Sequence, residues 1–132
     1  MKSSSDPGER LTPAGEDYLM KIHELSDGGK EPVRIRDLSV ALKVSPSSAS
    51  RMATAMSAEG FVNFRRYGYI TLTALGRQTG DYMRKRRALT TAALARLREV
   101  EESAVADEAE RAAHCLSPET VEALEQTLRN AP

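Results

Sequence analysis

The amino-acid sequence predicts a mainly α-helical protein in which a winged helix-turn-helix with a small β-hairpin is followed by further helices. Three observations support this fold class. Two short segments with apolar residues at helical spacing are joined by a short turn, an alternating stretch with a basic tip comes next, and a longer helical pattern starts at about Thr73. The 132 residues, 40% of them hydrophobic, suit one compact unit or two small ones that share a core.

The first predicted helix begins at Thr12 and Pro13, because a hydroxyl can cap a helix and proline fits its first position. Residues 1–11 before it are polar and are expected to form a loose arm. The helix ends at the turn-forming residues 26–29, and Val33 is expected to open a short strand. The apolar positions of this helix are Tyr18, Leu19, Ile22 and Leu25, and those of the short helix that follows are Ile35, Leu38, Ala41 and Leu42.

The stretch SPSSASRMATAM, residues 45–56, places four serines and an arginine at the start of the next predicted helix. Ser45 suits the N-cap and Pro46 the first turn, so the helix should run to about Glu59 and stop at Gly60. Its inward face would consist of Ala49, Met52, Ala53 and Met56, and its outward face of Ser47, Ser48, Ser50, Arg51 and Thr54. Two short helices joined in this way are typical of a helix-turn-helix.

The segment FVNFRRYGYITLT, residues 61–73, is typical of a β-hairpin, since Val62 and Phe64 alternate with polar residues and Ile70 and Leu72 do the same on the return. Its predicted turn carries Arg65, Arg66, Tyr67 and Gly68. A basic hairpin directly after a helix-turn-helix is interpreted as a wing.

A long helix is predicted from about Thr73 to a break near residues 99–100. Its inward candidates are Leu75, Tyr82, Met83, Leu89, Ala93 and Leu97. A further helix is predicted over roughly 101–115, and another opens at Ser117 and Pro118 with Val121, Leu124 and Leu128 on one face. We therefore expect a flexible arm at 1–11, a winged helix-turn-helix at 12–76 and a helical domain at 77–132.

The formal net charge of zero is a cancellation between two segments of opposite sign. Residues 61–98 contain nine basic side chains and one acid, Asp81, whereas residues 99–132 contain nine acids and two arginines. The acidic segment is interpreted as a solvated surface. The basic segment includes the predicted wing, so its charge is interpreted together with that of the wing.

Several function classes have little support in the sequence. No run approaches the roughly 20 apolar residues that cross a bilayer, and the first residues lack the apolar core of a secretory signal, so we expect a cytoplasmic protein without a membrane partner. The single Cys115 cannot form an internal disulfide, which agrees with a reducing compartment. No Ser-His-Asp set, glycine-rich phosphate loop or catalytic carboxylate pair is present, so an enzyme is not expected, and His23 is interpreted as a surface or helix-end residue.

The serine-rich helix favours double-stranded DNA as the partner. A helix in the major groove brings its N–H groups close to phosphates and base edges, and short hydroxyl side chains permit that approach. Arg51 is long enough to reach a guanine edge. The predicted DNA contacts are Ser47, Ser48, Ser50 and Arg51 on the helix and Arg65, Arg66 and Tyr67 at the wing, which would lie along the backbone. A protein-binding winged helix is the alternative, although both surfaces present hydroxyls and cations rather than an apolar patch.

Four stretches together carry a family resemblance: LTPAGEDYLMKIHEL, VRIRDLSVALKVSPSSASRMATAMSAEGFV, the hairpin leading into LTALGR, and AERAAHCLSPETVEAL. Over residues 11–128 the chain resembles the iron- and manganese-dependent repressor family, also called the diphtheria toxin repressor family. The resemblance implies a homodimer, a helical dimerisation domain after the winged helix, and a divalent metal, Mn²⁺ or Fe²⁺, that favours the DNA-binding form. Longer members add an SH3-like domain, and this sequence is interpreted as a short form without it.

The resemblance also implies a metal site at six positions, which here are Asp17, Met20, Arg87, Glu110, Ala113 and His114. Asp17 and Glu110 offer oxygens, His114 a nitrogen and Met20 a soft thioether, whereas arginine and alanine cannot bind a cation. The guanidinium at position 87, or that of Arg86 if the register differs by one, would repel a divalent ion or would replace it by pairing with the two carboxylates. We therefore expect a regulator of this type whose metal response is weakened, altered or absent.

Two other interpretations stay open on the same sequence. One is a winged-helix regulator that responds to an organic ligand or an oxidant, with Cys115 as its reporter. The other is a metal-independent winged helix that binds protein and never contacts DNA. Operator affinity measured against metal, chelator, peroxide and salt distinguishes the three.

Overall fold

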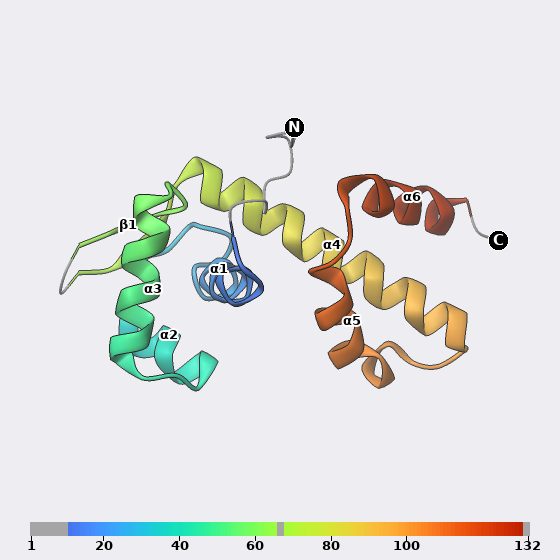
Figure 1. Ribbon diagram of the computed structural model, residues 1–132, viewed down its shortest axis with the longest axis horizontal. Coiled ribbons are helices and arrows are strands. Elements are labelled where there is room, and N and C mark those ends of the chain that lie inside the picture. Colours follow the sequence, from blue (N-terminus) through green and yellow to red (C-terminus); the bar gives the residue numbers. More distant parts are fainter. Residues whose placement is uncertain (1–10, 66–67, 131–132) are drawn as a thin grey trace. The chain divides into compact units, whose positions relative to one another are not determined.

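The computed structural model describes residues 11–65 and 68–130 (Figure 1). Its elements are α1 (Pro13–Leu25), α2 (Ile35–Leu42), α3 (Pro46–Ala58), β1 (Val62–Phe64), β2 (Ile70–Leu72), α4 (Ala74–Arg98), the 3-10 helix η1 (Glu102–Ala104), α5 (Ala106–Ala113) and α6 (Pro118–Arg129). They form two compact units that divide within α4, after Met83. The predicted fold class, mainly helical with a small two-stranded wing, is confirmed.

Three helices begin where local sequence signals predict them. The side chains of Thr12, Ser45 and Ser117 accept hydrogen bonds from the N–H groups of Gly15, Ser48 and Thr120, and each cap is followed by a proline at the first helical position. Each cap satisfies one of the N–H groups that a helix start leaves without a partner. The starts of α1, α3 and α6 are therefore fixed by residues within a single turn.

The first unit is built around α1, which is seen nearly end-on in Figure 1 with α3 and the hairpin to its left. Helix α1 packs against α2, α3 and β2, and α2 packs against α3. The largest fully buried side chains of this unit are Leu19, Ile22, Leu38, Met56, Phe61, Val62, Ile70 and Met83. Burial of each large apolar side chain stabilises the fold by about 1.5–3 kcal/mol. This core holds α3 by its apolar face.

The wing is a two-stranded antiparallel hairpin with Val62 opposite Leu72 and Phe64 opposite Ile70. The strand expected at Val33 is a single bridge, in which Val33 and Ile70 exchange backbone hydrogen bonds of 2.8 and 2.7 Å. The tip residues 66–67 lie outside the described part of the chain. The bridge ties the wing to the segment that leads into α2.

Helix α4 begins with an unusually close approach to the end of the third helix. The Thr73 hydroxyl lies 2.6 Å from the carbonyl oxygen of Gly60 and accepts the N–H of Gly76 at 3.0 Å. Gly76 is buried against Phe61, and a Cβ added there would overlap the Phe61 carbonyl oxygen. Glycine at position 76 is thus a requirement of packing.

His23 is buried, contrary to the surface position that the sequence suggested. It is 6% exposed, and its Nε2 atom lies 2.6 Å from Oδ1 of Asp81, the only acid of the basic segment. A Cβ at Gly80 would stand 2.5 Å from the His23 ring, so the glycine makes room for the imidazole. The His23–Asp81 contact joins the end of α1 to the first part of α4.

The second unit contains the rest of α4 with η1, α5 and α6. The predicted helix over 101–115 is divided into η1 and α5, which meet at the buried Val105. The carboxylate of Glu125 lies 3.0 Å from the Lys85 ammonium, and that of Glu108 lies 3.6 Å from the Arg98 guanidinium. The acidic segment therefore pairs in part with the basic one, in addition to facing solvent.

Three residues that the sequence placed on the apolar faces of their helices are exposed instead, among them Ala41 of α2. Leu25 at the end of α1 is 38% exposed, and Leu97 at the end of α4 is 79% exposed. Both stand in the last turn of their helix. Among the described residues, no helix combines the length and apolar character needed to cross a membrane.

Candidate nucleic-acid interface and metal positions

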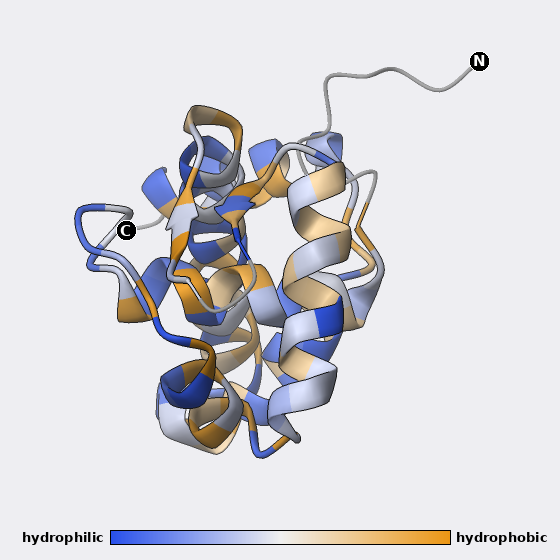
Figure 2. Ribbon diagram, turned by 90° about the vertical axis from the view of Figure 1, so that its left-hand side faces the viewer, coloured by the Kyte–Doolittle hydropathy of each residue, from blue (hydrophilic) through white to orange (hydrophobic). Residues whose placement is uncertain are grey.

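The two faces of α3 differ as the sequence predicted. Ala49 and Ala53 are fully buried and Met56 is 1% exposed, whereas Ser47 and Arg51 are exposed. Ser48 and Ser50 are half-buried. Met52, which was expected to face inward, is half-buried and packs against the hydrophobic core cluster. Figure 2 colours α3 mostly in the pale shades of serine, threonine and alanine. The helix thus presents small hydroxyl side chains and one cation to solvent.

Hydrogen bonds organise the first turns of this face. The Ser48 N–H donates to the Ser45 hydroxyl oxygen at 3.1 Å, and the Ser45 hydroxyl donates to that of Ser48 at 3.0 Å. Arg51 Nη2 lies 3.5 Å from the Ser48 hydroxyl oxygen, so the guanidinium extends back along the helix toward its N-terminus. These exposed bonds are weak enough to be exchanged for contacts to a ligand.

At the wing, Arg65 is exposed and its carbonyl oxygen accepts the N–H of Gly68 at 2.7 Å. Arg66 and Tyr67, the other predicted wing contacts, lie outside the described residues. The surface beside α3 therefore carries at least the cation of Arg65 in addition to Arg51.

A pair of residues that no sequence pattern predicted, Arg34 and Tyr69, lies beside this surface. Arg34, the N-cap residue of α2, donates a 3.2 Å hydrogen bond from Nη2 to the Tyr69 hydroxyl, and its guanidinium lies 5.5 Å from the centre of the Tyr69 ring. In the sequence, a tyrosine directly after the hairpin turn was the signal for this pair. The tyrosine alone does not identify its partner, because Arg34 is distant along the chain.

The predicted metal positions of the first unit are Asp17 and Met20, both on α1. Asp17 is half-buried. Met20 is 8% exposed and belongs to the hydrophobic core cluster, together with Leu19 and Ile22. Core packing alone accounts for a methionine at this position.

The other four predicted positions lie in the second unit. Arg87 is half-buried on α4, while its neighbour Arg86 is 3% exposed. On α5, Glu110 is exposed and Ala113 is buried, and His114 is half-buried as the C-cap residue. Glu110 and His114 are thus one helical turn apart, as predicted.

The side chains at the six positions that the family resemblance implies differ in what they offer a cation. Two of the six positions, Arg87 and Ala113, have no side-chain atom that can bind a cation. Within the described residues, no three or more His, Cys, Asp or Glu side chains lie close enough together to hold a metal ion. Cys115, adjacent to His114, is a free and exposed thiol.

Two protein-family models match adjacent parts of the chain. Residues 10–70 match the N-terminal DNA binding domain of iron dependent repressors, and residues 73–131 match the metal binding and dimerisation domain of the same repressors. Together they span nearly the whole sequence.

Solved structures with similar folds include regulators and a protein of unassigned function. The manganese regulator SloR is 25% identical with a TM-score of 0.74, and the metal-dependent transcriptional regulator MtsR is 24% identical with a TM-score of 0.76. Each match covers 92% of this chain and 56% of the other, so the chain spans little more than half of their length. The hypothetical protein SSo2273 from Sulfolobus solfataricus is 20% identical with a TM-score of 0.71, and 89% of each chain is covered.

Proposed function

Because the chain belongs to the iron-dependent repressor family and carries its DNA-binding domain and its metal-binding and dimerisation domain, we propose that the protein is a homodimeric transcription regulator that binds a palindromic DNA operator. The observation that carries this proposal is the exposed hydroxyl and arginine face of α3 beside the basic wing. Residues 12–76 would bind DNA, and residues 77–132 would form the dimer.

In this proposal each subunit inserts α3 into a major groove. Ser47, Ser48 and Ser50 contact phosphates or bases near the helix N-terminus, and Arg51 contacts a guanine edge. Arg65, Arg66 and Tyr67 contact the backbone and add affinity without reading much sequence. The buried alanines and Met56 support this role, because they fix the helix from behind.

The metal response of the family is proposed to be weakened, altered or absent in this chain. The support is the donor set: two of the six family positions carry arginine and alanine, and Met20 is packed in the core. A fixed guanidinium at position 87 opposes binding of a divalent cation by charge repulsion. Asp17, Glu110 and His114 keep donor atoms and are the residues that a remaining site would use.

DNA binding is tested by measuring the affinity of the purified protein for duplex DNA between 50 and 200 mM salt. Over this range, a protein that makes about 6–10 phosphate contacts loses affinity by a factor of about 10³–10⁵. We expect a steep loss with salt and tighter binding to a selected operator than to random DNA. No affinity, or an affinity that does not depend on salt, would favour a protein-binding winged helix instead.

The metal proposal is tested by isothermal titration with Mn²⁺ and Fe²⁺ and by operator binding with and without chelator. We expect no tight binding and little change in operator affinity, because position 87 holds a permanent cation. A tight site that disappears in Glu110→Ala would contradict this. The exposed thiol of Cys115 can be oxidised, so operator binding is also measured after treatment with peroxide. If peroxide abolishes operator binding by the wild-type protein but not by Cys115→Ser, the protein is an oxidant sensor instead.

A further inference from the structure

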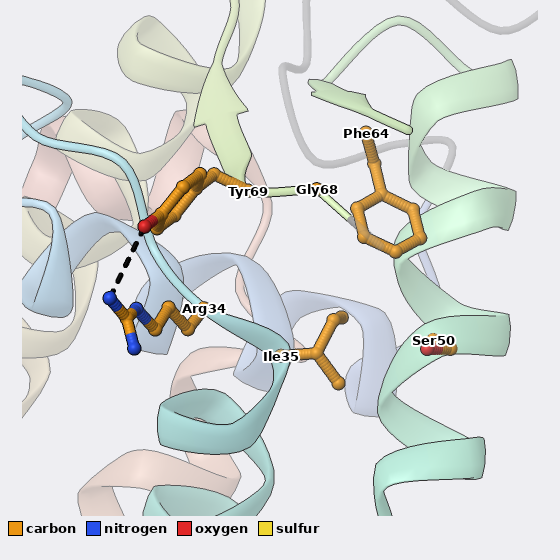
Figure 3. Close-up of a pocket in the computed structure, with 6 residues that line it drawn as sticks. All are labelled: Arg34, Ile35, Ser50, Phe64, Gly68 and Tyr69. Carbon is orange, nitrogen blue, oxygen red and sulfur yellow. Dashed lines mark hydrogen bonds between the residues drawn. The ribbon is translucent and has the colours of Figure 1, made fainter. Parts of the chain in front are cut away.

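A groove of about 510 Å³ opens between the start of α2, the middle of α3 and the wing (Figure 3). It is lined by Arg34, Ile35, Ser50, Phe64, Gly68 and Tyr69. Only Ser50 is among the DNA contacts predicted from the sequence. Since Ser50 also belongs to the outward half of α3, the groove continues the surface that is proposed to face DNA.

The walls of the groove have two different chemistries. Ile35 and Phe64 are half-buried, and Figure 3 shows their side chains pointing into the space from different elements. Arg34, Ser50 and Tyr69 are the polar residues of the lining, and Figure 3 shows the Arg34 guanidinium and the Tyr69 hydroxyl together on the side of the groove away from Ser50. A nucleotide of a DNA strand has the matching character, because its phosphate is anionic and its deoxyribose has an apolar C–H surface.

The Arg34 side chain contacts Tyr69 in the protein without a ligand. Its guanidinium donates to the Tyr69 hydroxyl at 3.2 Å and lies 5.5 Å from the centre of the same ring (Figure 3). Tyr69 itself follows Gly68 and stands next to Ile70, whose backbone is bridged to that of Val33. The wing and the N-terminus of α2 therefore form one support for the guanidinium, which restricts an otherwise flexible side chain.

We propose that this groove holds one sugar–phosphate unit of the DNA strand beside α3, with Arg34 contacting the phosphate and Tyr69 acting as a positioning residue for the guanidinium. The inference rests on the proposed function, because a strand can lie there only if α3 faces DNA. The contacts with Tyr69 occupy one N–H group and one face of the Arg34 guanidinium. The other N–H groups and the positive charge remain for a phosphate. Ile35 and Phe64 contact the sugar.

The test compares two arginines on the same segment. Arg34→Ala is expected to lower the salt slope of DNA binding by about 1 and to weaken binding about eightfold at 0.1 M salt, as loss of one phosphate contact does. Arg36→Ala removes the same charge two residues later, outside the groove, and is expected to stay within about twofold of the wild-type affinity with an unchanged slope.

The role of Tyr69 is tested by combining variants. Tyr69→Ala is expected to weaken DNA binding when Arg34 is present and to have no further effect in the Arg34→Ala protein, because the two residues act through one contact. Tyr69→Phe keeps the ring below the guanidinium and should fall between wild type and Tyr69→Ala. If Tyr69 only stabilised the wing, its loss would weaken binding equally in both backgrounds.

The outcomes separate this inference from the proposed function. If the wild-type protein binds DNA and Arg51→Ala weakens operator binding, while Arg34→Ala and Arg36→Ala have equal effects or none, the groove does not hold the strand and only this inference is overturned. If the wild-type protein does not bind DNA under any salt condition, both are overturned. A lowered slope confined to Arg34→Ala, with the coupling to Tyr69, supports the proposal.

Discussion

Gly76→Ala is expected to destabilise the first unit by about 3 kcal/mol or more, at the upper end of what overpacking costs. The added Cβ would overlap the carbonyl oxygen of Phe61, which is backbone and cannot rotate away, and would stand 3.1 Å from Leu72 Cδ2. To relieve the overlap, α4 must move away from β1, which also breaks the bonds that Thr73 makes to the carbonyl oxygens of Gly60 and Phe61. Urea denaturation followed by circular dichroism measures the loss.

Gly15→Ala is the matched control for this prediction. Gly15 occupies the same place in α1 that Gly76 occupies in α4, and its N–H donates to Thr12 as that of Gly76 donates to Thr73. Its nearest neighbours for a new Cβ are side-chain atoms, Leu11 Cδ2 at 3.3 Å and Thr12 Oγ1 at 3.4 Å. The expected change is within about 1 kcal/mol of wild type, since alanine also raises helix propensity. Equal losses in the two variants would refute the packing argument.

Arg51→Ala is expected to weaken operator binding by about 1–3 kcal/mol and to relax the preference at one base position. The reason is that a bidentate contact to guanine carries sequence information, which the exposed guanidinium on the outward face of α3 can supply. The measurement compares wild type and variant on an operator selected from randomised duplexes and on its single-base variants.

Arg65→Ala is the counterpart on the wing, where contacts are expected to fall on phosphates. It should weaken binding to operator and random DNA alike and lower the salt slope, because backbone contacts do not read sequence. If Arg51→Ala instead lost the same free energy on operator and random DNA, its assignment as a base-reading residue would be wrong.

Much of the fold could be predicted because its signals are local. A hydroxyl residue followed by proline marked the starts of α1, α3 and α6, and the cap bonds that fix those starts lie within one turn. Apolar spacing identified the buried side of α3, which in turn identified the side available for DNA. The exposure of Leu97 was not predictable in this way, because periodicity shows which stripe of a helix is apolar but not which residues of that stripe another element covers.

The parts that the sequence did not reveal depend on contacts between distant residues. His23 reaches Asp81 only because Gly80 has no side chain, and Arg34 meets Tyr69 through the bridge between Val33 and the wing. No spacing rule connects residues so far apart. The metal positions are a different case, since they were predicted from family resemblance and not from any local pattern. The same resemblance showed that position 87, where a metal ligand is expected, is an arginine.

The most direct test of the account asks whether the outward face of α3 contacts DNA. A photo-crosslinking p-benzoyl-phenylalanine placed at Ser47, which is exposed on that face, is expected to form a covalent product with operator duplex on irradiation. The same substitution at Leu97, which is 79% exposed on α4 in the second unit, should give no DNA product. Crosslinking of DNA from position 97 but not from position 47 would contradict the assignment of α3 as the DNA-binding helix.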